Sequence, residues 1–419
     1  MNRRDILKLS AAGVAAAALA PRAPARLGAK PWKVGVIGCG GRGTGAAANA
    51  LEASPDAVVT ALADVFSERV ESARKHLTDP QNAWAGRVQV DPARCFTGFD
   101  AYRALLATDV DVVLLATPPH FRPMHLAAAV AAGKHAFVEK PVAVDAPGVR
   151  SVLASAETAR QKQLSIVAGT QRRHERSYLE AMARVRSGAI GRIVSARCYW
   201  NQGGLWMHPR KPEWNDMEWQ LRNWLYFTWL SGDHIVEQHV HNLDVLNWAI
   251  GAHPQRALGF GGRQVRTSPA YGHVFDHFAI EYEYPGGISA LSMCRQIDGC
   301  AGRVEEVIVG TEGVCTTSSG RARIEGAHPW KFDGDAGNPY VQEHVDLFGA
   351  IASGTPLNEA AQIAESTLTA IQGRMSAYTG QAVTWEQALA SKLDLAPPSY
   401  AFGELSMPAV AVPGSTPLI

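Results

Sequence analysis

The sequence predicts an α/β protein with a doubly wound parallel sheet in its N-terminal part and a second α/β domain after it. Short β-branched runs alternate with helical stretches as far as about residue 160. Later segments alternate apolar and polar residues, as half-buried strands do, and 419 residues exceed what one compact core usually organises. Apolar residues make up 47% of the chain and charged residues 19%, which excludes a disordered or collagen-like protein.

Residues 1–25 have the pattern of an export signal. Arg3 and Arg4 precede an Ala-rich apolar stretch, and the segment ends at Ala23-Pro24-Ala25, which resembles a cleavage site. Paired arginines before a mildly apolar core are typical of twin-arginine signals, which export folded proteins. The stretch is too short and too Ala-rich to favour a membrane anchor. We therefore expect cleavage, a periplasmic location and no stable membrane insertion.

The charge and cysteine patterns exclude several classes of partner. Forty basic and 39 acidic residues nearly cancel, so no basic field indicates a nucleic-acid partner. The six cysteines are scattered without metal-type spacing, and we expect free thiols. His234, His239 and His241 do not have the spacing of a metal site either. We expect no metal.

A glycine-rich turn opens the chain after the signal. Residues 33–37 predict a buried strand, and residues 44–53 predict a helix. In the G-x-G-x-x-G between them, Gly38 permits a tight turn, Gly40 permits close approach of a pyrophosphate, and Gly43 permits packing of the helix on the strand. The helix N-terminus offers free N–H groups to an anion. We expect the cofactor's pyrophosphate to be held by Gly38, Gly40, Gly41, Arg42 and Gly43.

A second predicted strand, over residues 58–63, ends at an acidic residue. Asp64 lies twenty-one residues after Gly43. A carboxylate there accepts hydrogen bonds from a ribose 2′-OH and repels a 2′-phosphate. The pattern favours NAD over NADP, with Arg42 and Arg69 as groups that could moderate the preference.

Two further strands, over residues 111–116 and 135–138, carry polar residues at their carboxyl ends. The helices expected after them cover residues 121–132 and 144–160, and a strand at 165–169 leads out of the domain. Ligands of doubly wound sheets bind at the carboxyl ends of the strands. We therefore expect the nicotinamide end of the cofactor to lie beside Thr117, Pro118, His120, Glu139 and Lys140.

Together these motifs resemble the glucose–fructose oxidoreductase/inositol dehydrogenase/MocA (Gfo/Idh/MocA) family. The resemblance is carried by residues 38–43, 116–120, 133–141, 171–173, 187–191 and 232–248, within about residues 32–385. It implies a Rossmann domain followed by an α/β domain with an open, largely antiparallel sheet that commonly forms an oligomer interface. We expect an NAD-binding domain over 31–160, a substrate-binding and oligomerisation α+β domain over 161–390, an arm over 391–419, and a homo-oligomer.

The resemblance also implies roles for three residues. Lys140 contacts the reacting hydroxyl and its bond to Pro141 can be cis, His241 takes the hydroxyl proton, and Glu237 stands where an aspartate is usual. From the residues alone, 233–249 predict one helix with Glu237 and His241 on one face. A neutral imidazole suits the base, and Lys140 would stabilise the alkoxide. We expect the neighbouring carboxylate to orient His241 and raise its pKa.

The second half of the chain predicts strands, two helices and a tryptophan-rich loop. The strands are expected at 192–200, 256–265, 275–284, 288–296 and 305–310, the helices at 340–353 and 359–378, and an extended arm or disordered end at 396–419. Seven of the eleven tryptophans lie between residues 200 and 248. Indole faces stack on sugar rings, but an aromatic cluster or a subunit contact explains them equally. The candidate substrate-binding residues are Arg173, Trp224 and Asp244.

The expected compartment constrains the function. The periplasm has no pool of free nicotinamide cofactor, so we expect NAD to be loaded before export, retained and recycled within the site. The first hypothesis is an oxidoreductase acting on a secondary hydroxyl of a sugar, cyclitol or glycoside. The second is an NAD-dependent glycoside hydrolase working by oxidation, elimination and reduction, like the α-N-acetylgalactosaminidases of the wider family. The third is a non-catalytic sugar-binding protein.

Overall fold

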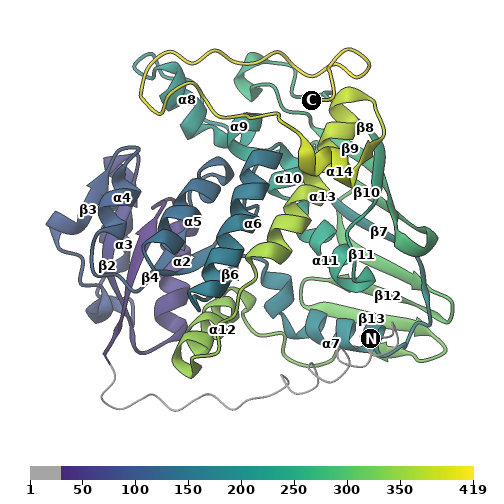
Figure 1. Ribbon diagram of the computed structural model, residues 1–419, viewed down its shortest axis with the longest axis horizontal. Coiled ribbons are helices and arrows are strands. Elements are labelled where there is room, and N and C mark those ends of the chain that lie inside the picture. Colours follow the sequence, from purple (N-terminus) through teal and green to yellow (C-terminus); the bar gives the residue numbers. More distant parts are fainter. Residues whose placement is uncertain (1–29) are drawn as a thin grey trace.

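Two β-sheets, each with its own helices, organise the chain in the computed structural model (Figure 1). The structure describes residues 30–419, so the signal peptide expected over 1–25 lies outside the described residues. Within the described part, no helix is both long and apolar enough to cross a membrane.

The first sheet has six parallel strands in the order β3-β2-β1-β4-β5-β6. Its strands are β1 (Trp32–Ile37), β2 (Ala57–Asp64), β3 (Cys95–Thr97), β4 (Val112–Leu115), β5 (His135–Val138) and β6 (Ile166–Ala168). The helices between them are α2 (Gly41–Ala53), α3 (Ser67–Leu77), α4 (Ala101–Leu106), α5 (Arg122–Ala131) and α6 (Ala146–Gln161). The doubly wound prediction is confirmed. The strand order reverses between β1 and β4, which places a ligand crevice at their carboxyl ends.

The first sheet reaches beyond the boundary expected at residue 160. Strand β6 pairs with β5 although it follows that boundary. Helix α12 (Pro339–Ser353) also returns to this part of the molecule, where Leu347 and Phe348 are buried in one apolar cluster with Val34 and Ala46. The first domain is therefore completed by chain from the far side of the second.

The second sheet has nine strands in the order β14-β13-β12-β11-β7-β10-β9-β8-β15, and all its pairs are antiparallel except β7 with β10. The strands are β7 (Ile193–Gln202), β8 (Arg256–Gly262), β9 (His277–Tyr284), β10 (Ile288–Gln296), β11 (Arg303–Gly310), β12 (Gly313–Ser318), β13 (Arg321–Gly326), β14 (Trp330–Lys331) and β15 (Val383–Thr384). Helices α11 (Val240–Ile250) and α13 (Ala360–Thr379) pack against it, while α7 (Arg176–Arg186) and α14 (Trp385–Ala390) lie towards its ends. The largely antiparallel second sheet is confirmed. Strands β12 to β15 were not among the expected strands.

The helix expected over 233–249 is broken. Helix α10 (His234–Glu237) ends at Glu237, and α11 begins only at Val240. Asp233, with a φ of +71°, starts α10 and is buried: its carboxylate accepts from the N–H groups of His234 (2.6 Å) and Phe275 (2.7 Å). Because the break interrupts the helical hydrogen-bond ladder, it leaves the carbonyl of Glu237 available to another donor.

The tryptophan-rich segment forms structure instead of the expected irregular loop. It contains α8 (Asp216–Arg222) and α9 (Thr228–Ser231), and Trp219 and Trp229 are buried in an apolar cluster with Phe66 and Phe121 of the first domain. The C-terminal arm lies extended across the molecule beside α8 (Figure 1, yellow), where Gly403 accepts from the N–H of Met217. Of the two alternatives for the tail, the structure has the extended arm.

Candidate active site

A cavity of about 1190 Å³ lies between the carboxyl edge of the first sheet and the second domain. Its first-domain wall comes from the glycine-rich turn and the ends of β2, β4 and β5. Its second-domain wall comes from β7, the tryptophan-rich segment, α10 and α11. The expected residues that line it are Gly38, Gly40, Gly41, Arg42, Asp64, Thr117, Pro118, Glu139, Lys140, Trp224, Glu237 and His241.

The glycine-rich turn has the shape of an anion cradle. Gly38 has a φ of +97°, and a Cβ there would lie 2.5 Å from the Thr117 nitrogen. A Cβ on Gly43 would lie 1.7 Å from the Gly38 oxygen, so both positions require glycine. Gly40 and Gly41 instead face the open cavity. Since Gly40 precedes α2 and has no side chain to cap it, the first N–H groups of this helix remain for an anion.

Asp64 lies at one end of the cavity with its carboxylate fixed. Its oxygens accept from the N–H groups of Cys39 (2.7 Å) and Phe66 (3.0 Å), and burial raises its pKa. Each oxygen retains a second acceptor site for a ribose hydroxyl. Of the two arginines expected to influence this end, Arg69 lies beside Asp64. Arg42 is held by Glu139 and Glu343.

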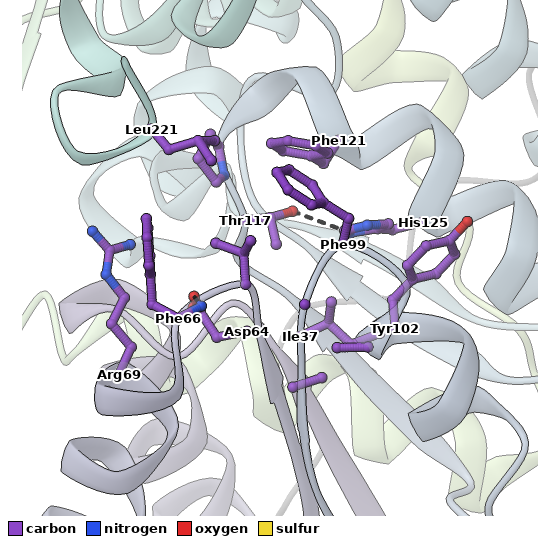
Figure 2. A pocket seen from close by; sticks show the side chains of 15 residues that line it. Ile37, Asp64, Phe66, Arg69, Phe99, Tyr102, Thr117, Phe121, His125 and Leu221 are labelled. Carbon is purple, nitrogen blue, oxygen red and sulfur yellow. Dashed lines mark hydrogen bonds between the residues drawn. The ribbon is translucent and has the colours of Figure 1, made fainter. Parts of the chain in front are cut away.

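A small apolar cavity continues from Asp64 (Figure 2). Phe66, Phe99, Phe121 and Leu221 line it, and Arg69 and Asp64 lie at its lower edge in the view. The Thr117 hydroxyl at the end of β4 lies 3.2 Å from His125 Nδ1, within hydrogen-bond distance. Flat apolar groups fit such walls, because aromatic side chains prefer to pack against other π-faces.

Lys140 and Glu237 join the two domains inside the large cavity. The Lys140 ammonium donates to the Glu237 carbonyl (2.6 Å) and to Glu237 Oε1 (2.9 Å). The carbonyl is the one that the helix break leaves free. An ammonium has three donors, so one remains for a ligand. The Lys140–Pro141 peptide is cis, as the resemblance implied.

His241 reaches the same cavity from α11. Its ring stacks on Trp200 with centroids 5.7 Å apart and an interplanar angle of 22°. Burial, with the nearby Lys140 ammonium second, lowers its pKa well below 6.5, so the imidazole is neutral at pH 7. The expectation that a carboxylate would raise this pKa is wrong, because Glu237 pairs with Lys140 instead.

Four expected residues do not line the large cavity. Arg173 and Asp244 form a bidentate pair with each other, at 2.8 and 2.9 Å. His120 lies 2.8 Å from the Tyr400 hydroxyl of the arm, and Gly43 is covered by Gly38. These four residues therefore do not border the cavity that Lys140 and His241 line.

Several residues of the cavity wall escaped the sequence analysis. They are Glu68, Gln171, Trp200, Trp206, His208, Arg222, Gln238 and Tyr340. The density of tryptophan between residues 200 and 229 was the only signal for part of this wall. Among residues 30–419, no cluster of His, Cys, Asp or Glu has the arrangement of a metal site, and all six cysteines are free.

Comparisons with known proteins identify the family of both domains. Residues 32–168 match the model of the oxidoreductase family with an NAD-binding Rossmann fold, residues 178–316 match the Gfo/Idh/MocA C-terminal domain, and residues 1–20 match the twin-arginine translocation signal. A glycosyl hydrolase family 109 protein of Streptomyces coelicolor is 34% identical over 44% of this chain and 39% of its own length. Inositol 2-dehydrogenase 3 of Saccharopolyspora erythraea is 27% identical over 60% of this chain and 70% of its own.

The fold also matches solved structures. Levoglucosan dehydrogenase, in a complex with NADH and levoglucosan, has a TM-score of 0.67 at 18% identity, over 84% of this chain and 99% of that one. Several curated relatives are matched over less than half of their length. With both domains and the export signal matched, the chain belongs to the Gfo/Idh/MocA oxidoreductase family.

Proposed function

We propose that the protein is a periplasmic, NAD-dependent oxidoreductase that acts on a secondary hydroxyl of a sugar, cyclitol or glycoside. The observation that carries the proposal is the pairing of two groups in one cavity. An ammonium with a free donor and a neutral imidazole both line the cavity that contains the anion cradle. Dehydrogenation of an alcohol needs these two functions, a donor to the developing alkoxide and a base for the proton.

The residues of the first domain fit a dinucleotide. The cradle at residues 38–43 would hold the pyrophosphate, Asp64 the adenosine ribose, and the small apolar cavity the base. Thr117, Pro118 and Lys140 would lie at the nicotinamide end, where the cofactor accepts the hydride. Asp64 favours NAD over NADP, because a buried carboxylate repels a 2′-phosphate.

Two side chains, His241 and Lys140, act on the reacting hydroxyl. A ring nitrogen of His241 takes the hydroxyl proton, and Lys140 Nζ donates its third hydrogen bond to the oxygen as negative charge develops. Glu237 holds the ammonium in place through two acceptors. Trp200 fixes the plane of the His241 ring. Trp224 and Trp206, with ring centroids 6.3 Å apart in the same cavity, provide apolar faces for the substrate.

Export by the twin-arginine route favours a retained cofactor. A folded protein can carry NAD out of the cytoplasm, where the cofactor is made. The hydride from the carbinol C–H bond and the proton from its hydroxyl would then return, in the same site, to the carbonyl carbon and oxygen of a second compound. No free cofactor is consumed in that cycle.

The second candidate is an NAD-dependent glycoside hydrolase. The 34% identity with a glycosyl hydrolase family 109 protein favours it. It needs the same first oxidation, which acidifies the neighbouring C–H bond so that elimination can cleave the glycoside. The two candidates differ only after the first hydride transfer.

We also propose a homo-oligomer formed through the open face of the second sheet. Phe260 on β8 is 77% exposed, and Leu258, Leu291 and Met293 are exposed on β8 and β10. Exposed apolar groups in such a row mark a protein-binding surface. Light scattering of wild type and Phe260→Asp tests this assignment; equal masses for both would contradict it.

The deciding experiment follows the dinucleotide that copurifies with the protein. Its absorbance and mass are recorded before and after addition of free sugars, cyclitols and glycosides. Formation of NADH by a free sugar supports the oxidoreductase, and release of an aglycone supports the hydrolase. A protein that binds no dinucleotide contradicts both. A protein that binds NAD and sugars without reducing the dinucleotide or releasing an aglycone is the non-catalytic sugar-binding protein, and contradicts both as well.

A further inference from the structure

The Asp64 end of the cavity is covered by residues from two distant parts of the chain. Arg222 of α8 donates to Glu68 of α3 (2.7 Å), and its guanidinium lies 4.0 Å from the centre of the Phe66 ring. Phe402 of the arm lies 5.9 Å from Phe66 and 5.3 Å from Phe99, measured between ring centroids. The second domain and the arm thus both meet the first domain at Phe66, and the arm also meets it at Phe99.

These two phenylalanines also line the small cavity beside Asp64 (Figure 2). Phe66 therefore lines the cavity and also contacts Arg222 and Phe402, the two residues that cover it. Glu68, Arg69 and Arg222 line the adjoining part of the large cavity. A group bound at Asp64 would lie beneath this cover, and it could not leave in that direction while the cover stays in place.

The arm is fixed to both domains at this point. The Gly403 carbonyl accepts from the N–H of Met217 (3.1 Å), and the Leu405 carbonyl accepts from Gln220 Nε2 (2.9 Å). Tyr400 reaches the first domain, where its hydroxyl lies 2.8 Å from His120 Nε2. Segment 400–405 is consequently held between α8 and the strand ends of the first sheet.

A shared apolar cluster also connects the two domains beside the arm. It joins Phe66 and Phe121 of the first domain with Met217, Trp219 and Trp229 of the second. Where a loop or a domain closes over a bound group, release of that group requires the loop or domain to move away. In this protein such a movement would expose the cluster and break the Glu68–Arg222 ion pair.

We infer that Arg222, Tyr400 and Phe402 form a latch that retains the adenosine half of the bound dinucleotide. This inference rests on the proposed function, because it requires that the cavity binds a dinucleotide. It adds the means of retention: the cofactor is loaded before the arm is docked, and it leaves only when the latch opens. The latch acts on the rate of dissociation, whereas Asp64 and the glycine cradle act on recognition.

The test measures how fast bound NAD exchanges with isotopically labelled NAD. The full-length protein is incubated with the labelled dinucleotide, desalted at intervals and analysed by mass spectrometry after denaturation. We expect Phe402→Ala to exchange about tenfold faster than wild type or more, because two aromatic contacts are lost. Phe402→Leu, which keeps apolar contact, should lie between the two. Met407→Ala is the matched control, because Met407 is an arm residue of similar exposure outside segment 400–405, and it should exchange at the wild-type rate.

Thermal unfolding of each variant separates the latch from a general loss of stability. Faster exchange in Phe402→Ala than in a Met407→Ala protein of similar melting temperature supports the latch. If Phe402→Ala does not fold, Tyr400→Phe removes only the hydroxyl and should still accelerate exchange severalfold. Wild-type exchange rates in these variants would overturn the latch and leave the proposed function standing. A wild-type protein that takes up no dinucleotide would overturn the proposed function as well.

Discussion

Two ion pairs tie residues 140–173 to the helical segment at 237–244, and they leave different groups available. The cations are almost equally exposed, 13% for the Lys140 side chain and 12% for that of Arg173. Asp244 accepts twice from Arg173 and once from Ser366 (2.8 Å), and neither residue of the pair lines the cavity, so the Arg173–Asp244 pair is closed to a ligand there. Lys140 donates twice to Glu237 and keeps one donor facing the cavity. An ion pair becomes a reactive site when one partner retains an unused donor towards a cavity.

The largest effect on the reaction rate is expected from removing the Lys140 ammonium, the cation with an unused donor. Lys140→Met keeps the length of the side chain and removes the donor to the developing alkoxide. We expect hydride transfer to fall by about 10²–10³-fold, the usual cost of one such donor. Single-turnover formation of NADH with an excess of substrate measures it. The copurified NAD content is the control and should stay near wild type, whereas unchanged turnover would contradict the assignment.

Breaking the closed Arg173–Asp244 pair should lower the free energy of unfolding and leave kcat nearly unchanged. Arg173→Met leaves the Asp244 carboxylate buried with Ser366 as its remaining side-chain donor. Breaking a buried pair costs about 3–5 kcal/mol of unfolding free energy. Urea unfolding measures this, and kcat per folded molecule should stay within about threefold of wild type. A large loss of kcat in a stable Arg173→Met protein would show that Arg173, like Lys140, takes part in the reaction.

Sequence alone predicted the parts of the site that neighbouring residues determine. The roles of Gly38, Gly40 and Gly43 follow from a single turn of chain, and Asp64 follows from the end of the next strand. Gly38, Gly40 and Asp64 line the cavity, and Gly43 lies directly beneath Gly38. Lys140 and His241 could be named because the motifs around them resemble those of the Gfo/Idh/MocA family.

What sequence could not predict depends on contacts between distant residues. The start of α10 is fixed by Asp233, whose carboxylate is bound by Phe275 and by Tyr378 (2.5 Å), 42 and 145 residues away. The helix then breaks after Glu237. Without that break, the Glu237 carbonyl would be bonded inside a helix and closed to Lys140. Arg173–Asp244 and Lys140–Glu237 each join a basic residue to an acidic one, so their surroundings distinguish the two pairs.

A smaller effect is expected from the carboxylate of the open pair. Glu237→Gln keeps the backbone acceptor and an oxygen for Lys140, and it removes only the negative charge. We expect kcat/KM to fall about tenfold, the value of one charge-assisted hydrogen bond. Glu237→Asp is the matched variant, since it retains the charge on a shorter arm. A loss as large as that of Lys140→Met would mean that Glu237 itself exchanges protons with the substrate.

The smallest effect is expected from moderate acidification. Because the pKa of His241 lies well below 6.5 in the folded protein, its imidazole stays unprotonated as the pH falls from 8 to 6. We expect kcat/KM to change by less than about twofold over this range. An acidic limb with a midpoint near 6.5, absent from His241→Ala, would show that the lowered pKa is wrong.

Stability sets the lower end of that pH range. Burial lowers the pKa values of His125, His239 and His344 to about 3. The unfolded chain, with histidine pKa values near 6.5, therefore binds more protons than the folded chain below that pH. The stability that these neutral imidazoles contribute is complete above pH 6.5 and is lost as the pH falls towards 3. Circular dichroism at each pH distinguishes this unfolding from a change at the Lys140–Glu237 pair. Activity that falls together with ellipticity reports protonation of the buried histidines. Activity that falls while the ellipticity persists reports a change at the active site.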